Sequence, residues 1–160
     1  MSWDDRDPRR VTTDAGSDVD PAISPNGRDI TFTSNRTGNN DIYVIDSTGE
    51  NAVNLTNHPA NDAWPRWSAD GTRIIFHSNR AGNFDIWSMD PFGGNLVNLT
   101  PNSPLSDNTA EVSPDGRKIA FTRNLAAGGD IFTMDMDGSN QVNVTNSPGY
   151  DSIVTWSPDN

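Results

Sequence analysis

The chain has 160 residues, no cysteine and a formal net charge of −11. This length suits one ordinary domain, and the lack of cysteine excludes a disulfide framework and thiolate metal sites. The acidic balance makes nucleic acid an unfavourable partner, and no apolar run approaches the length of a membrane span. Asp far outnumbers Glu, and together with Asn, Gly, Ser, Thr and Pro it gives a turn-rich composition that predicts an all-β protein. A surface adapted to high salt or to binding cations would give the same charge.

An internal repeat of 44 to 45 residues organises the chain, and three sequence markers keep one register within it. The first marker is a Ser-Pro-Asp-Gly-like motif at 24–27, 68–71, 113–116 and 157–160. The second is an Asp-Ile pair at 41–42, 85–86 and 130–131. The third is an aliphatic residue followed by Thr at 11–12, 55–56, 99–100 and 144–145.

Each repeat predicts four short strands separated by tight turns. The Ser-Pro-Asp-Gly motif is a turn after the first strand, because Pro presets φ and Gly accepts positive φ. The second strand alternates apolar and polar residues, as at Ile30 and Phe32, whereas the third, at 42–45, is apolar on both faces. A fourth strand closes the repeat at Val53 and Leu55. Four strands at this period predict a propeller blade, and stacked blades bury a shared core.

The segment 113–122, Ser-Pro-Asp-Gly-Arg-Lys-Ile-Ala-Phe-Thr, followed by Asp-Ile at 130–131 and Val-Thr at 144–145, resembles the repeat of TolB-type β-propellers. The resemblance covers nearly the whole chain, from about residue 10 to residue 160. It implies a six-bladed propeller, usually periplasmic or secreted, that binds other proteins. Similar propellers also precede hydrolase domains in prolyl-oligopeptidase-like peptidases, so the resemblance is specific for fold and not for function.

The chain departs from the family pattern because it holds only three complete blades, which we place at 13–56, 57–100 and 101–145. Residues 1–9 form a tail, 10–12 the last strand of a preceding blade and 146–160 the start of a following one. We therefore expect an incomplete or open propeller whose end blades leave apolar faces uncovered. The chain would then be a piece of a longer propeller, a part of a ring completed by further copies, or a unit of a head-to-tail filament.

One aspartate recurs before the first strand of every repeat, at Asp18, Asp62, Asp107 and Asp151. Repetition would place these carboxylates in an arc near one axial face, and calcium prefers several oxygen ligands. They are therefore candidate calcium ligands, and the alternative is that each one caps its own turn through backbone N–H groups. A second recurrent set, before the third strand, is expected to make structural hydrogen bonds to a neighbouring turn or blade; its members are Asp41, Asp85 and Asp130.

The sequence shows no nucleophile elbow or phosphate-binding glycine loop, and its two histidines, His58 and His77, have no metal-ligand spacing. We therefore expect a non-enzymatic propeller module that binds a protein partner or other copies of itself through its open blade faces. By resemblance, its location is periplasmic or extracellular. One alternative is the propeller portion of a larger prolyl-oligopeptidase-like hydrolase. Another is a subunit of a calcium-stabilised extracellular filament.

Overall fold

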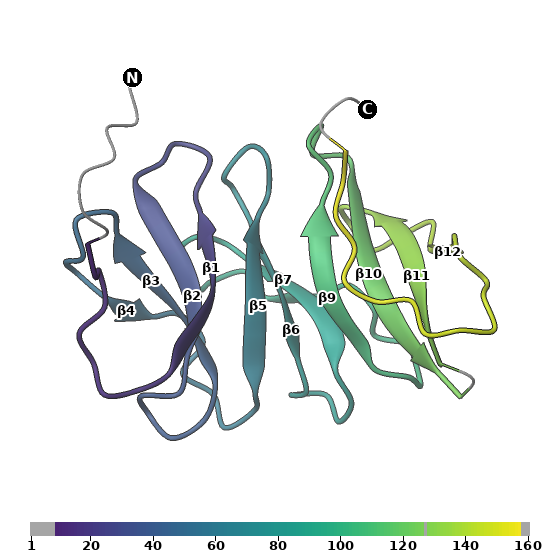
Figure 1. The fold of residues 1–160 in the computed structure, drawn as a ribbon, viewed down its shortest axis with the longest axis horizontal. Helices are drawn as coiled ribbons and strands as arrows, with labels where there is room; N and C mark the ends of the chain where they lie inside the picture. Colours follow the sequence, from purple (N-terminus) through teal and green to yellow (C-terminus); the bar gives the residue numbers. More distant parts are fainter. Residues whose placement is uncertain (1–8, 127, 158–160) are drawn as a thin grey trace.

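The computed structural model describes residues 9–126 and 128–157, and its regular elements are all β-strands. They form three four-stranded antiparallel sheets in which strands that follow one another in sequence are neighbours in space. Figure 1 shows the three sheets side by side in an open stack. The predicted all-β fold of four-stranded antiparallel blades is confirmed. Residues 1–8 of the predicted tail and residues 158–160 of the last repeat lie outside the described residues.

The twelve strands of the described residues divide equally among the three blades. Blade 1 comprises β1 (Asp18–Ile23), β2 (Asp29–Ser34), β3 (Asp41–Asp46) and β4 (Val53–Asn54). Blade 2 comprises β5 (Asp62–Trp67), β6 (Ile74–Ser78), β7 (Asp85–Met89) and β8 (Val97–Asn98). Blade 3 comprises β9 (Asp107–Val112), β10 (Lys118–Leu125), β11 (Gly128–Asp135) and β12 (Val142–Asn143).

The Ser-Pro-Asp-Gly motif forms the turn between the first two strands of each blade, as its chemistry predicts. In blade 2, the Ser68 hydroxyl donates to Asp70 Oδ1 at 2.6 Å and accepts the N–H of Arg73 at 2.9 Å. Gly71 closes the turn with φ near +71°, a backbone conformation that a side chain would strain. Because the same bonds recur in blades 1 and 3, each hairpin is set locally by its own residues.

The hydrophobic core lies between blades rather than within them. At the first junction, Ile42 of blade 1 packs with Ile74, Phe76 and Met89 of blade 2, all of them fully buried or nearly so. The second junction is larger, and its buried members are Ile75, Ile86, Leu99, Ala110, Ile119, Phe121 and Met134. Burial of each such side chain contributes about 1.5–3 kcal/mol, so the blades hold one another in place.

A buried aspartate at the start of each third strand fastens that strand to the fourth. Asp41 accepts hydrogen bonds from the side chains of Thr37 and Asn54 at 2.8 Å and from the Thr56 hydroxyl at 3.1 Å. The equivalent bond from Asn to Asp recurs at 2.8 Å in blade 2 and at 2.6 Å in blade 3. The structural hydrogen bonds predicted for these aspartates are present, and the Asn of each Asn-x-Thr triplet of the repeat donates one of them.

Each first strand contains a β-bulge, and in blades 2 and 3 this bulge bonds to the preceding blade. Trp64 and Thr109 lie in the bulges of β5 and β9 and have φ values of 61° and 48°, in the left-handed region that non-glycine residues seldom adopt. The N–H of Trp64 donates to Thr33 Oγ1 at 3.1 Å, and that of Thr109 donates to His77 Nδ1 at 3.4 Å. The bulges therefore turn backbone donors towards the neighbouring blade.

Burial of His77, which accepts the bond from Thr109, makes stability depend on pH, because it lowers the pKa of His77 from 6.5 to about 4. Between these values the unfolded chain binds more protons than the folded one. The contribution of neutral His77 to the free energy of unfolding is fully present above pH 6.5. It is lost as the pH falls through about 4, with a slope of at most about 1.4 kcal/mol per pH unit. Urea denaturation across this range should show the loss in the native chain and a shallower loss in His77→Asn, whose amide oxygen accepts a hydrogen bond without titrating. Equal slopes would contradict the assignment.

Candidate binding surfaces

In each of the three blades, a largely buried arginine joins the recurrent aspartate of the first strand to two aromatic rings. In blade 2, Arg80 Nη2 donates to Asp62 Oδ2 at 2.8 Å and Arg80 Nε donates to Ser78 Oγ at 2.9 Å. The same guanidinium lies over the rings of Phe76 and Trp87, with its central carbon 5.6 and 5.2 Å from their centroids. The arginine thus combines an ion pair with cation–π contacts in a poorly solvated place, where both are strong.

The same arrangement occurs in the other two blades, from arginines that the sequence analysis did not single out. Arg36 donates to Asp18 Oδ1 at 3.0 Å, and Arg123 donates to both oxygens of Asp107 at 2.7 and 2.8 Å. Arg36 and Arg80 follow their aspartates by 18 residues, whereas Arg123 follows Asp107 by 16. Only Arg36 and Arg80 therefore occupy equivalent positions of the repeat. Their shared spacing from an aspartate is the sequence signal that could have identified them.

The structure places the four candidate calcium ligands at equivalent positions, but three of them are engaged by arginine. Burial works to raise the pKa of Asp18, and hydrogen bonds from Ser34, Arg36 and Thr12 outweigh it and hold that pKa below its ordinary value. Asp151 donates its N–H to the Gly129 carbonyl at 2.7 Å. Within residues 9–126 and 128–157, no three His, Cys, Asp or Glu side chains gather as a metal site. Calcium binding at Asp18, Asp62, Asp107 and Asp151 stays a prediction.

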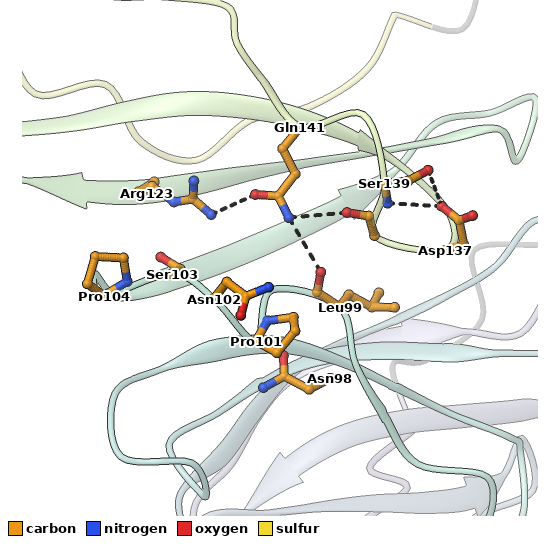
Figure 2. Close-up of a pocket in the computed structure, with 11 residues that line it drawn as sticks. Asn98, Leu99, Pro101, Asn102, Ser103, Pro104, Arg123, Asp137, Ser139 and Gln141 are labelled. Carbon is orange, nitrogen blue, oxygen red and sulfur yellow. Dashed lines mark hydrogen bonds between the residues drawn. The ribbon is translucent and has the colours of Figure 1, made fainter.

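A crevice of about 390 Å³ lies between blades 2 and 3 (Figure 2). Gln141 projects into it from blade 3, and its Oε1 accepts a hydrogen bond from Arg123 at 3.0 Å. Its Nε2 donates to the carbonyl oxygens of Gly138 at 3.1 Å and Leu99 at 3.5 Å. Since the amide of Gln141 already bonds to both blades, the crevice is a polar seam between them.

A second surface, which we call the turn face, consists of the turns that join the first strand to the second and the third to the fourth in each blade. In antiparallel sheets these turns lie at one end, and the β1–β2, β5–β6 and β9–β10 turns form the upper edge of Figure 1. Grooves of about 430 and 320 Å³ separate successive blades on this face. The first runs between the turns of blades 1 and 2, and the second between those of blades 2 and 3.

The carboxylates of the turn face are held in the ionised form. Hydrogen bonds from the Thr48 hydroxyl and the Glu50 N–H lower the pKa of Asp46 to about 2. The N–H groups of Gly94 and Phe92 lower the pKa of Asp90 in the same way. Hydrogen bonds likewise lower the pKa of three further turn aspartates, through Ser68 at Asp70, Ser113 at Asp115 and Ser139 at Asp137. This face therefore stays anionic in mildly acidic solution.

The stacked, four-stranded antiparallel repeats define a protein of the β-propeller class. The family model of the TolB β-propeller domain matches residues 1–160, and the chain belongs to this family. A comparison with curated proteins found no match. No helix among the described residues is long and apolar enough to cross a bilayer.

Two solved structures share 28% sequence identity with this chain. The putative TolB from Agrobacterium tumefaciens superposes with a TM-score of 0.79, over 85% of this chain and 51% of that one. TolB from Acinetobacter baumannii superposes with a TM-score of 0.65, over 76% of this chain and 31% of that one. A puromycin-hydrolysing peptidase from Mycobacterium tuberculosis shares only the fold, at 16% identity and a TM-score of 0.64 over 80% of this chain and 20% of that one. The chain thus spans from about a fifth to about half of the length of these proteins.

Removing the arginine of blade 2 should destabilise the fold strongly. In Arg80→Gln, the fully buried Asp62 loses its ion pair, and breaking a buried pair costs about 3–5 kcal/mol of unfolding free energy. Arg117→Gln is the matched control, because Arg117 is 83% exposed and lies 3.8 Å from Asp115. It should change the unfolding free energy by less than about 0.5 kcal/mol. Urea denaturation of both variants measures the difference, and equal effects would refute a buried role for the arginine.

Proposed function

We propose that this chain is a non-enzymatic β-propeller module that associates, through its two end blade faces, with blades of a protein partner or of other copies of itself. The observation that carries the proposal is the unequal exposure of equivalent residues. Leu99 of blade 2 is covered by blade 3 and is 4% exposed. Val144, at the equivalent position of blade 3, is 53% exposed. A position that a neighbouring blade covers elsewhere in the chain is therefore available for contact at the end of the stack.

The face of blade 1 has the same character at the opposite end of the stack. Val19 and Ile23 of its first strand are 46% and 65% exposed, beside the buried apolar cluster of Phe32, Tyr43 and Ile45. Pro21 is exposed there, although the equivalent Pro65 is buried at the junction between blades 1 and 2. The equivalent faces of blades 2 and 3 are packed against a preceding blade, which supports a blade as the occupant of this face.

The segments that flank the three blades follow the repeat pattern. A Cβ at Gly49 would lie 2.9 Å from the Val11 carbonyl oxygen, much as a Cβ at Gly93 would lie 2.5 Å from that of Leu55. Val11 therefore has the place of a preceding fourth strand. At the other end, the indole N–H of Trp156 donates to the Glu111 carbonyl at 3.1 Å. Both contacts support further blades as the occupants of the end faces.

A periplasmic or extracellular location belongs to the proposal, and its support is the similarity to the two TolB structures. Fractionation of host cells into periplasm, cytoplasm and medium tests it, and recovery of the protein in the cytoplasm alone would exclude it. A calcium-stabilised extracellular filament is a special case of self-association, and polymers that survive a chelator would exclude calcium as the stabiliser.

A second candidate is the propeller portion of a larger hydrolase. It is favoured by the shared fold with the Mycobacterium tuberculosis peptidase, of which this chain covers 20%. A nucleophile elbow of the form Gly-x-Ser-x-Gly, encoded within an α/β pattern downstream in the parent gene, would establish it.

Association through the end faces should make the solution mass depend on concentration. Light scattering after size exclusion should show species heavier than the 17.4 kDa chain, with their share rising with concentration. Ile23→Asp places a charge on the exposed face of blade 1 and should shift the population towards monomer by about tenfold or more in dissociation constant. In the control, Val53→Asp, the mass should not change, because the equivalent Val97 remains 45% exposed in the middle blade. A monomer at every concentration would overturn self-association and leave the blades of a protein partner as the occupant of the end faces.

A further inference from the structure

We propose that the groove beside Phe92 on the turn face binds a cationic peptide segment with an apolar side chain, contributed by a partner protein. The proposal concerns a surface away from the end faces, and it does not rest on the association of blades.

Phe92 is the anchor of this surface. Its side chain is 90% exposed, whereas the equivalent residues of the other blades are the polar Thr48 and Asp137. The same hairpin of blade 2 exposes Leu96 and Val97. Val97 has similarly exposed equivalents in Val53 and Val142, whereas the exposed Phe92 and Leu96 occur in blade 2 where blade 1 has Thr48 and Ala52. Exposed apolar side chains that gather on a surface mark interaction sites. Exposed aromatic residues are also common among the residues that dominate binding energy at interfaces.

The turn that carries Phe92 is held rigidly. Asp90 Oδ1 accepts the N–H groups of Phe92 and Gly94, both at 2.9 Å, and Asp90 Oδ2 accepts the Asn95 amide at 2.8 Å. The Gly93 N–H closes the turn onto the Asp90 carbonyl at 3.1 Å. A side chain presented on a rigid turn loses little conformational freedom when a partner binds, so more of its contact energy is available as affinity.

The groove of about 430 Å³ between blades 1 and 2 begins beside this anchor, because Pro91 lines it. Its other walls include the ring of Trp67, the ring of Pro25 and the two β-turns that contain Asn26 and Asp70. This mixture of apolar rings with a few polar groups is typical of a site that takes a side chain of a peptide. A peptide that lies along the groove would therefore reach Phe92 at one end.

The charges around the groove define the partner. Asp29 and Asp70 line it, and Asp90 lies in the turn next to Pro91. Hydrogen bonds lower the pKa of Asp70 and Asp90, which stay ionised in mildly acidic solution. Arg73, the basic side chain of the same hairpin region, donates to Ser88 Oγ and to the Asn95 carbonyl. A segment with Lys or Arg next to an apolar side chain complements both the carboxylates and Phe92.

Fluorescence anisotropy with short labelled peptides tests the proposal. The probe alternates lysine with leucine. One control peptide replaces each lysine with glutamate, and the other replaces each leucine with serine. Binding of the native chain to the probe alone is the expected result. Phe92→Ser should weaken this binding by about tenfold or more. Val53→Ser, at a half-exposed valine of blade 1, should leave the binding unchanged.

A variant that lacks one carboxylate tests the electrostatic part of the recognition separately from the apolar contact with Phe92. Asp70→Asn removes one carboxylate, and Asn26 at the equivalent position of blade 1 shows that the turn accepts an amide. This variant should weaken probe binding a few-fold at low salt and lose its effect at high salt. The matched control is Asp115→Asn, which lies in the turn of blade 3 outside this groove and should bind as the native chain does.

Three results would overturn the proposal. The first is the absence of probe binding with a dissociation constant below about 1 mM, and the second is equal binding by native chain and Phe92→Ser. The third is loss of self-association in Phe92→Ser without probe binding by the native chain, because the occupant would then be a second copy. Ile23→Asp should bind the probe normally, so failure of this proposal and failure of blade association are distinguishable.

Discussion

The structure depends on burial of apolar side chains between adjacent sheets. A single four-stranded blade has an apolar set on each face, as Ile74 and Ile75 on neighbouring positions of β6 show, because one belongs to each junction. No blade buries both sets alone, so stability comes from stacking. The same constraint explains why equivalent positions differ so much in exposure between the middle of the stack and its ends.

Backbone donors in the bulges of β5 and β9 bond to the preceding blade and keep the stack in one register, and polar side chains fasten the strands within each blade. The aspartates that begin the third strands are buried and accept hydrogen bonds from Asn and Thr, and those that begin the first strands are paired with arginine. Buried charge is tolerated where it is paired and hydrogen-bonded, and an apolar face alone would allow neighbouring sheets to slide. The arginine stacks on aromatic rings of its own blade, and in this way it links the polar and apolar parts of one blade.

The surfaces of the blades differ where a residue departs from the repeat pattern. Three hairpins share one backbone design, but only that of blade 2 carries an exposed phenylalanine, and it stands beside a groove with ionised carboxylates. A repeated scaffold that holds its turns rigidly through Asx-type bonds permits such a change without cost to the core. Function in this family of folds is therefore best sought in the departures from the repeat, and not in the residues that recur.

The sequence by itself determined the period, the four antiparallel strands of each blade, the turn motifs and the structural role of Asp41 and its equivalents. These features depend on local chemistry, such as alternation along a strand and the φ preferences of Pro and Gly, which a repeat displays three times over. Only the tertiary structure decided that arginine engages Asp18, Asp62 and Asp107, that the first strands are bulged at Trp64 and Thr109, and that Phe92 stands beside a groove. These features arise where long side chains and neighbouring blades meet in space, and the linear spacing of residues does not encode such contacts.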